Sequence, residues 1–265
     1  RAHAERLPGC PLPRGLSVTN SLEDAVAEAE ALFLVVTSDN VVQVTEQVAA
    51  LARPGTAFIV CAKGLARDGS FLTDAVREIW TDGPVLFLSG PSFAHEVAQG
   101  KRTIVALAGP IEAARQIASA YSSDRFVMTP TSDLIGVQVA GVFKNVAAIL
   151  CGASDGLKAG SNTRAALMSE AIREAASIVV ALGGNQSTLL GPAGFGDFAL
   201  SCTDAQSRNY CLGRDLATGH DDDGTTHEGA ANVAALLDLA NGANVDAPLV
   251  EAVARLVARE IDAEE

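Results

Sequence analysis

Lys144 is the residue whose placement says most about chemistry. It lies in an apolar stretch from Val142 to Leu150, in which only Asn145 is also polar. Burying an ammonium group is costly, so two interpretations compete. Either the aliphatic stem carries the charge to water, or the helix borders a cleft where a partly desolvated amine acts as a general base. Asn145 points about 100° away around such a helix, and it either contacts the same ligand or fills a packing gap.

Two segments that directly follow apolar runs are suited to hold an anion. Gly90-Pro91-Ser92 comes just after the run 85–88, and a helix starting near Ser92 would present free backbone N–H groups. Lys63 comes just after the run 57–61. Each segment has a plain alternative, because most Gly-Pro turns only reverse the chain and a lone lysine is commonly a surface residue.

A third segment combines flexible backbone with a cation. The stretch from Gly191 to Asp197 is rich in glycine, and Ser207-Arg208-Asn209 follows it. One interpretation is a loop followed by a capped helix start. The other is a substrate loop in which Arg208 holds a phosphate or carboxylate through two parallel hydrogen bonds.

These residues need a scaffold, and the first half of the chain predicts one of alternating strands and helices. Unbroken apolar runs predict strands at 32–36, 57–61, 85–88 and 103–108, with a short last strand at 125–128. Helical spacing predicts helices at 41–52 and 71–80, and Pro110 opens another. This alternation indicates a mostly parallel sheet, and such sheets bind ligands beyond the carboxyl ends of their strands.

The second half of the chain has a different pattern of apolar residues. Helices are predicted at 134–150, 163–182, 208–218, 228–241 and 248–261, and no strand-like alternation appears. We therefore expect an α/β fold followed by an all-α one. The expected boundary gives a sheet domain over residues 1–130 and an all-α substrate domain over residues 131–265.

Charge and composition argue against several classes of function. The formal net charge of −13 argues against a nucleic-acid partner. No apolar run reaches the roughly 18 residues of a membrane helix, so no membrane span is expected. Five scattered cysteines without a CxxC pair indicate reduced thiols and a cytoplasmic protein. The histidines are far apart in the sequence, and we expect no metal site.

Several motifs together resemble the bacterial type of the NAD(P)-dependent glycerol-3-phosphate dehydrogenase family, in the family's order and at about its spacing. They are Ser89-Gly90-Pro91-Ser92-Phe93-Ala94-x-Glu96, Gly141-x-x-Lys144-Asn145-Val146, Ser154-Asp155-Gly156-Leu157, Asn162-x-Arg164-Ala165-Ala166-Leu167, and Gly194-x-Gly196-Asp197 leading to Ser207-Arg208-Asn209. The resemblance covers roughly residues 8 to 260. It implies NAD or NADP as cofactor, a small-molecule phosphate substrate, and a place in phospholipid synthesis.

The resemblance also implies roles for individual residues. Lys144 would exchange the proton of the C2 hydroxyl of glycerol 3-phosphate, with Asp197 orienting it and Arg208 on the substrate phosphate. The implied catalytic residues are Lys144, Lys63 and Asp197. The implied substrate-binding residues are Lys63, Gly90, Ser92, Asn145, Asp197, Ser207, Arg208 and Asn209. The implied cofactor-binding residues are Ser38, Lys63, Ala94, Arg208 and Glu228.

The sequence departs from the family pattern at its beginning. The family opens with a strand, a GxGxxGxA loop and a helix, whereas the match here begins near Leu7. We therefore expect a truncated Rossmann-like sheet domain with an exposed apolar edge. The family's Val-Glu-Gly motif appears in altered form as His227-Glu228-Gly229, after a shortened loop.

Three functions remain open on the sequence. The first is a glycerol-3-phosphate dehydrogenase recorded without its first residues. The second is a truncated, non-catalytic relative that keeps anion binding or an interaction role. The third is a sibling dehydrogenase that acts on another small hydroxy acid. The choice between NAD and NADP and the oligomeric state are not fixed by the sequence, and a homodimer is the assembly we consider.

Overall fold

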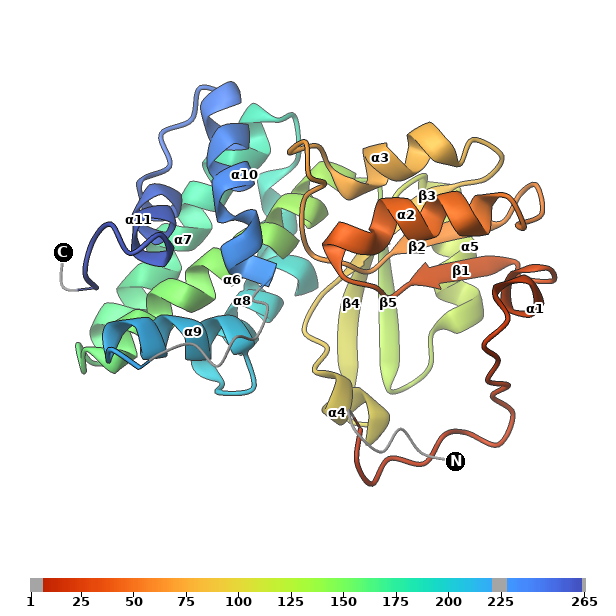
Figure 1. Cartoon of the computed structure of the whole chain (residues 1–265), viewed down its shortest axis with the longest axis horizontal. Coiled ribbons are helices and arrows are strands. Elements are labelled where there is room, and N and C mark those ends of the chain that lie inside the picture. The colour runs from red at the N-terminus through yellow and green to blue at the C-terminus, as the bar shows by residue number, and fades with distance from the viewer. Residues whose placement is uncertain (1–6, 221–227, 264–265) are drawn as a thin grey trace.

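The computed structural model describes residues 7–220 and 228–263, which form a sheet covered by helices and a helical bundle beside it (Figure 1). The sheet has the order β1-β2-β3-β4-β5. Its strands are β1 (Ala31–Leu34), β2 (Ala57–Val60), β3 (Val85–Ser89), β4 (Thr103–Ala108) and β5 (Phe126–Thr131). Only the β3–β4 pairing is antiparallel within the described sheet. The prediction of a mostly parallel sheet is therefore confirmed.

Helices cover both faces of this sheet. On one face, α2 (Ser38–Ala49) and α3 (Leu72–Ile79) share a core with β2, where Phe58 stacks on Trp80 with ring centroids 4.5 Å apart. On the other face, α5 (Ile111–Tyr121) packs its alanines against β2, β3 and β4. The short helices α1 (Leu22–Val26) and α4 (Ala94–Ala98) complete this half. Burial on both faces explains why β2 is an unbroken apolar run.

The strand β1 lies at the edge of the described sheet, as the missing opening motif led us to expect. Its residues Ala31, Leu32 and Phe33 are partly exposed, and Val35 just beyond it is 77% exposed. The edge is therefore apolar, and one side of its backbone has no neighbouring strand among the described residues.

The helical half is built around one long helix, α6 (Leu134–Gly156). Around it pack α7 (Ser161–Ala181), α8 (Asp197–Thr203), α9 (Arg208–Ala217), α10 (Glu228–Gly242) and α11 (Pro248–Val257). By length and composition α6 could cross a membrane, contrary to the expectation of no such stretch. However, 78% of its apolar window is buried inside the protein, as in a core helix.

The segment between α7 and α8 differs most from the prediction. The expected loop is a 3₁₀ turn, Gln186–Leu190, followed by a π turn, Pro192–Gly196, that leads directly into α8. The backbones approach closely here, because a Cβ on Gly194 would lie 2.2 Å from the Leu189 carbonyl oxygen. Glycine at this position therefore permits a tight turn that brings Asp197 inward. The helix expected to start near Ser92 begins at Ala94.

Candidate functional site

The site lies where strands of the sheet end against α6. Lys63 follows β2 and Gly90 follows β3, so both stand at the carboxyl edge of the parallel strands. Gly90 has a φ of 153°, and a Cβ there would lie 2.8 Å from the Cα of Val105. Only glycine fits this close approach to β4, which keeps the Gly90 carbonyl oxygen turned toward Lys63.

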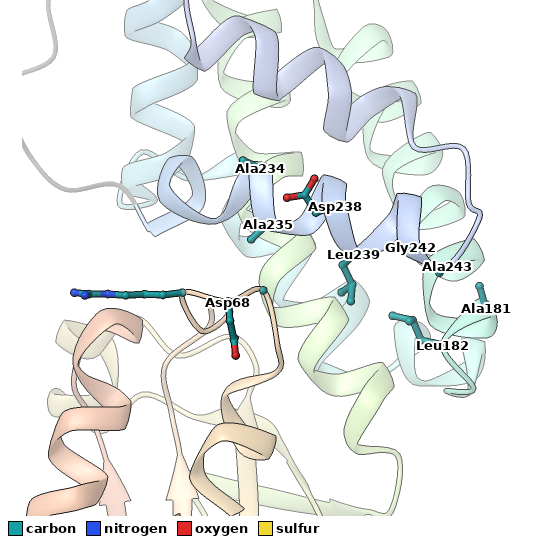
Figure 2. Close-up of a pocket in the computed structure, with 11 residues that line it drawn as sticks. Asp68, Ala181, Leu182, Ala234, Ala235, Asp238, Leu239, Gly242 and Ala243 are labelled. Carbon is teal, nitrogen blue, oxygen red and sulfur yellow. The ribbon is translucent and has the colours of Figure 1, made fainter. Parts of the chain in front are cut away.

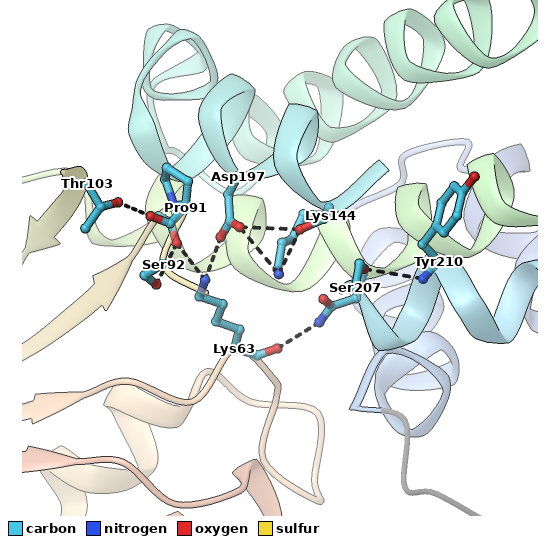
Figure 3. Close-up of polar contacts among 11 residues, drawn as sticks. Lys63, Pro91, Ser92, Thr103, Lys144, Asp197, Ser207 and Tyr210 are labelled. Carbon is cyan, nitrogen blue, oxygen red and sulfur yellow. Dashed lines mark hydrogen bonds and ion pairs between the residues drawn. The ribbon is translucent and has the colours of Figure 1, made fainter. Parts of the chain in front are cut away.

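A buried carboxylate joins the two lysines (Figure 3). Asp197, the first residue of α8, is 2% exposed. Its Oδ2 lies 2.6 Å from Nζ of Lys63, and its Oδ1 lies 3.5 Å from Nζ of Lys144. The lysine side chains are 17% and 14% exposed, respectively. Two lysine amines around one carboxylate suit an anionic substrate or a developing alkoxide.

Ser201 joins this cluster and was not among the predicted site residues. Lys144 Nζ donates a hydrogen bond to Ser201 Oγ over 3.1 Å, and Ser201 Oγ donates to Asp197 Oδ1 over 3.4 Å. Ser201 follows Asp197 by four residues, one turn along α8, so both side chains point the same way. The four-residue spacing could have indicated Ser201, but only if residues 197–203 had been recognised as a helix.

Lys63 is held by the helical half as well as by its own strand. Its Nζ donates to the Gly90 carbonyl oxygen over 2.9 Å. Asn145, buried beside Lys144 on α6, donates through Nδ2 to the Lys63 carbonyl oxygen at 3.4 Å. Asn232 of α10 accepts from the Leu65 N–H at 2.7 Å. Sequence reasoning missed Asn232, whose only signal is a polar side chain among the apolar residues of α10.

The Gly90-Pro91-Ser92 turn borders the same cluster. Ser92 Oγ donates to the Gly90 carbonyl oxygen over 3.0 Å, and the Thr103 hydroxyl donates to the Pro91 carbonyl oxygen. The turn is thereby fixed between β3 and β4. Ala94, the first residue of α4, is exposed beside it. The expected N–H-rich helix start at Ser92 is replaced by this hydrogen-bonded turn.

The predicted phosphate-binding residues form a separate part of the site, at the first turn of α9. Ser207 caps this helix, its Oγ accepting from the Tyr210 N–H at 3.3 Å. Arg208 is exposed and has no hydrogen bond or ion pair to the described residues. Asn209 is buried, and its Oδ1 has no hydrogen-bond partner there. The structure thus brings Lys63, Lys144 and Asp197 into contact but does not bring Arg208 into contact with them.

Buried thiols around the lysines do not supply further negative charge. Burial raises the pKa of the Cys61 thiol to about 12, with Lys63 only partly opposing it. A hydrogen bond with Cys151, followed by burial, raises the pKa of Cys202. Both groups are therefore neutral near pH 7, and Asp197 is the counter-ion of the two lysines.

Three of the predicted cofactor residues, Ser38, Lys63 and Ala94, lie along the carboxyl edge of β1, β2 and β3. Ser38 is the first residue of α2, which follows β1. It lies close to Gly64, because a Cβ on Gly64 would be 2.7 Å from the Ser38 Cβ. The free N–H groups of the first α2 turn and the Lys63 ammonium suit anionic phosphates. These residues therefore fit an anionic dinucleotide. Glu228 opens α10, but its side chain lies outside the described part of the chain.

Two cavities flank the meeting of the sheet and the helices. One, of about 570 Å³, is lined by Pro91, Ser92 and Gly196 and so borders the cluster of Lys63, Lys144 and Asp197. A larger one, of about 870 Å³, lies between the Arg67–Gly69 turn, the end of α7 and α10 (Figure 2). None of the predicted site residues lines the larger cavity. The titratable groups of the predicted site therefore lie beside the smaller cavity.

Known proteins match this chain over nearly its whole length. The models of the NAD-dependent glycerol-3-phosphate dehydrogenase N-terminus and C-terminus match residues 1–115 and 133–265. Glycerol-3-phosphate dehydrogenase [NAD(P)+] of Halorhodospira halophila is 38% identical over 97% of this chain and 80% of its own length. The Roseobacter denitrificans enzyme of that name is 37% identical over 100% of this chain and 83% of its own length. The crystal structure of glycerol-3-phosphate dehydrogenase from Coxiella burnetii, 34% identical, superposes with a TM-score of 0.92 over 97% and 82% of the two chains.

Proposed function

The chain belongs to the NAD-dependent glycerol-3-phosphate dehydrogenase family, and from this premise we propose how its residues carry out the family's reaction. The protein is an oxidoreductase that interconverts glycerol 3-phosphate and dihydroxyacetone phosphate with NAD or NADP. The non-catalytic alternative is not favoured. The observation that carries the proposal is the buried carboxylate of Asp197 between Lys63 and Lys144.

Lys144 is the group that exchanges the substrate proton. Oxidation of the C2 hydroxyl removes a hydride from carbon and a proton from oxygen, so a base must stand at that oxygen. The Lys144 amine lies 3.5 Å from Asp197 Oδ1 and donates a hydrogen bond to Ser201 Oγ. These two contacts orient the amine. In the reverse direction the same amine, protonated, donates to the forming alkoxide.

Lys63 supplies fixed positive charge next to that proton transfer. Its close pair with Asp197 and its bond to the Gly90 carbonyl oxygen hold its ammonium group in place. A preorganised cation stabilises negative charge that develops on the substrate oxygen. Asp197 in turn orients both amines, and Asn145 fixes the backbone of Lys63.

Arg208 binds the phosphate of the substrate. A dianionic phosphate needs a fixed cation, and a guanidinium offers two parallel donors. Support comes from its exposed position at the N-terminus of α9, where the helix dipole also favours an anion. Ser207 and Asn209 flank it, and we assign both to the same substrate region.

The cofactor is held along the carboxyl edge of the parallel strands. Ser38, Lys63 and Ala94 are the residues there that we assign to it, together with Glu228 and Arg208 on the helical side. When bound, the nicotinamide cofactor accepts or supplies the hydride. The turn at Gly90 and Ser92 lies between this edge and Lys144, so we assign it to the border of substrate and nicotinamide.

The test is NADH and NADPH oxidation by the purified protein with dihydroxyacetone phosphate. Oxidation that depends on this substrate is expected, with dihydroxyacetone turned over far less well. Comparable turnover of non-phosphorylated hydroxy acids in the oxidative direction would instead indicate the sibling dehydrogenase. If protein expressed from the full coding sequence is folded but shows no turnover, the proposal is contradicted.

Domain division, localisation and assembly complete the proposal. We assign residues 1–130 to the cofactor domain and 131–265 to the substrate domain. A cytoplasmic location is supported by five cysteines that are all free thiols. A homodimer is supported by the exposed apolar side chains of Leu190 and Phe195. Light scattering on the purified protein would test the assembly, since a monomeric mass at micromolar concentration would contradict the dimer.

A further inference from the structure

A second shared carboxylate lies away from the reacting centre, at the far end of α6. Asp155 Oδ2 accepts hydrogen bonds from both Arg164 Nη1 and the Tyr210 hydroxyl. These three residues come from α6, α7 and α9, so one oxygen joins three helices. The Arg164 and Asp155 side chains are only 28% and 19% exposed, respectively. No step of the reaction described above uses this cluster.

Tyr210 stands in the first turn of α9, two residues after Arg208. At this turn the backbones of α6 and α9 are in contact, because a Cβ on Gly152 would lie 1.9 Å from the Tyr210 carbonyl oxygen. A Cβ on Gly213 would likewise lie 1.9 Å from the Ile149 carbonyl oxygen. The glycines allow the two helices to touch, while the Tyr210 hydroxyl bonds the first turn of α9 to Asp155 of α6.

The same helix carries the proposed base. Asp155 follows Lys144 by eleven residues on α6, which brings it back to within about 20° of the same helix face. Along the axis the two residues are roughly 16 Å apart. The same helix thus carries both Lys144 and Asp155, and Asp155 is bonded to the turn of α9 that includes Arg208.

We propose that Asp155, Arg164 and Tyr210 form a positioning cluster that sets the distance and direction of Arg208 relative to Lys144, and so fixes the substrate phosphate. This inference rests on the proposed role of Arg208. Burial and the hydrogen bond to Asp155 raise the pKa of Tyr210, so its hydroxyl is a stable donor at neutral pH. The hydrogen bond to Asp155 also raises the pKa of Arg164, which remains a cation.

The chain offers a matched pair of variants, because its two tyrosines are Tyr210 and Tyr121. Tyr210→Phe removes only the hydroxyl from the cluster. Tyr121→Phe removes a hydroxyl from α5, on the sheet domain, where the ring packs edge-on against Phe33. We expect Tyr210→Phe to raise KM for dihydroxyacetone phosphate about tenfold, because small misplacement of a binding group is costly. Its kcat should change less than twofold, and Tyr121→Phe should match the wild type.

Three further readouts separate positioning from general damage. Inorganic phosphate, as a competitive inhibitor, should show a raised inhibition constant in Tyr210→Phe. The value of kcat/KM for dihydroxyacetone, which has no phosphate, should not change. Asp155→Asn should reproduce the KM effect, and Arg164→Lys, which keeps the charge, should show a smaller one than Arg164→Gln.

The outcomes are distinct. Equal losses for dihydroxyacetone phosphate and dihydroxyacetone would show a merely structural cluster and overturn the inference. An unchanged KM in Tyr210→Phe, with a raised KM in Arg208→Gln, would overturn the inference but leave the assignment of Arg208 intact. An unchanged KM in Arg208→Gln would overturn that assignment and the inference with it.

Discussion

Asp197 and Asp155 are two carboxylates that each join several elements of the fold but differ in their surroundings. Each accepts from more than one donor, and each joins elements distant in sequence. Asp197 is almost fully buried between the sheet and the helices, and its partners are two lysines. Asp155 is partly exposed among helices, and its partners are an arginine and a tyrosine.

The choice of partners separates the two regions. A lysine amine can lose and regain a proton when its surroundings favour it, whereas an arginine stays charged. A carboxylate between two lysines therefore suits proton exchange, and one between arginine and tyrosine suits permanent attachment. The type of side chain that donates to the aspartate therefore distinguishes the cluster that exchanges a proton from the cluster that holds helices together.

The sharpest test of this difference is Lys144→Ala. We expect kcat to fall by about a thousandfold, in the range typical of losing a general acid–base group. NADH binding, followed by fluorescence, should be unchanged, because no assigned cofactor contact is removed. Lys101→Ala, at an exposed lysine paired with Glu96, is the matched control and should keep full activity. Near-normal turnover of Lys144→Ala would remove Lys144 from its assigned role.

Asp197→Asn should impair both turnover and folding. It removes the buried negative charge that lies 2.6 Å from the Lys63 ammonium, and breaking such a buried pair costs about 3–5 kcal/mol. Urea unfolding should therefore show a lower free energy of unfolding, and kcat should fall at least tenfold. Unchanged stability would mean that water already compensates the two lysines, so that the site is not closed.

Arg208→Gln should affect binding more than turnover. A hydrogen bond to a charged group is worth about 1.5–3 kcal/mol, so KM for dihydroxyacetone phosphate should rise roughly ten- to a hundredfold. Stability should be unchanged, since Arg208 has no ion pair within the described chain. Steady-state kinetics with and without the phosphate on the substrate checks this, and equal losses would favour the sibling dehydrogenase.

Asp155→Asn should lower stability much less than Asp197→Asn. The ion pair with Arg164 is partly exposed, so water screens it, and such pairs contribute about 1 kcal/mol or less. Urea unfolding should register a loss of that size, well below the loss for Asp197→Asn. A loss as large as that of Asp197→Asn would erase the distinction between the two carboxylates.

The sequence predicted the strands and long helices well because their apolar patterns are set by burial. The run Ala57–Cys61 and the helix around Lys144 are examples. It failed between residues 186 and 203, where tight turns of glycine and proline lead into α8 without an amphipathic pattern. Ser201 and Asn232 were missed for a related reason. Their contacts with Lys144 and Leu65 join distant parts of the chain, which spacing alone does not reveal.

The burial of α6 has a consequence for amide hydrogen exchange. Its residues from Val137 to Phe143 and from Asn145 to Cys151 include few that reach the surface. Backbone amides in such a helix exchange with solvent only when the core as a whole opens. The peptide around Lys144 should therefore be among the slowest to take up deuterium, while the first turn of α9 exchanges faster. The reacting amine is thus carried by the part of the molecule that opens last.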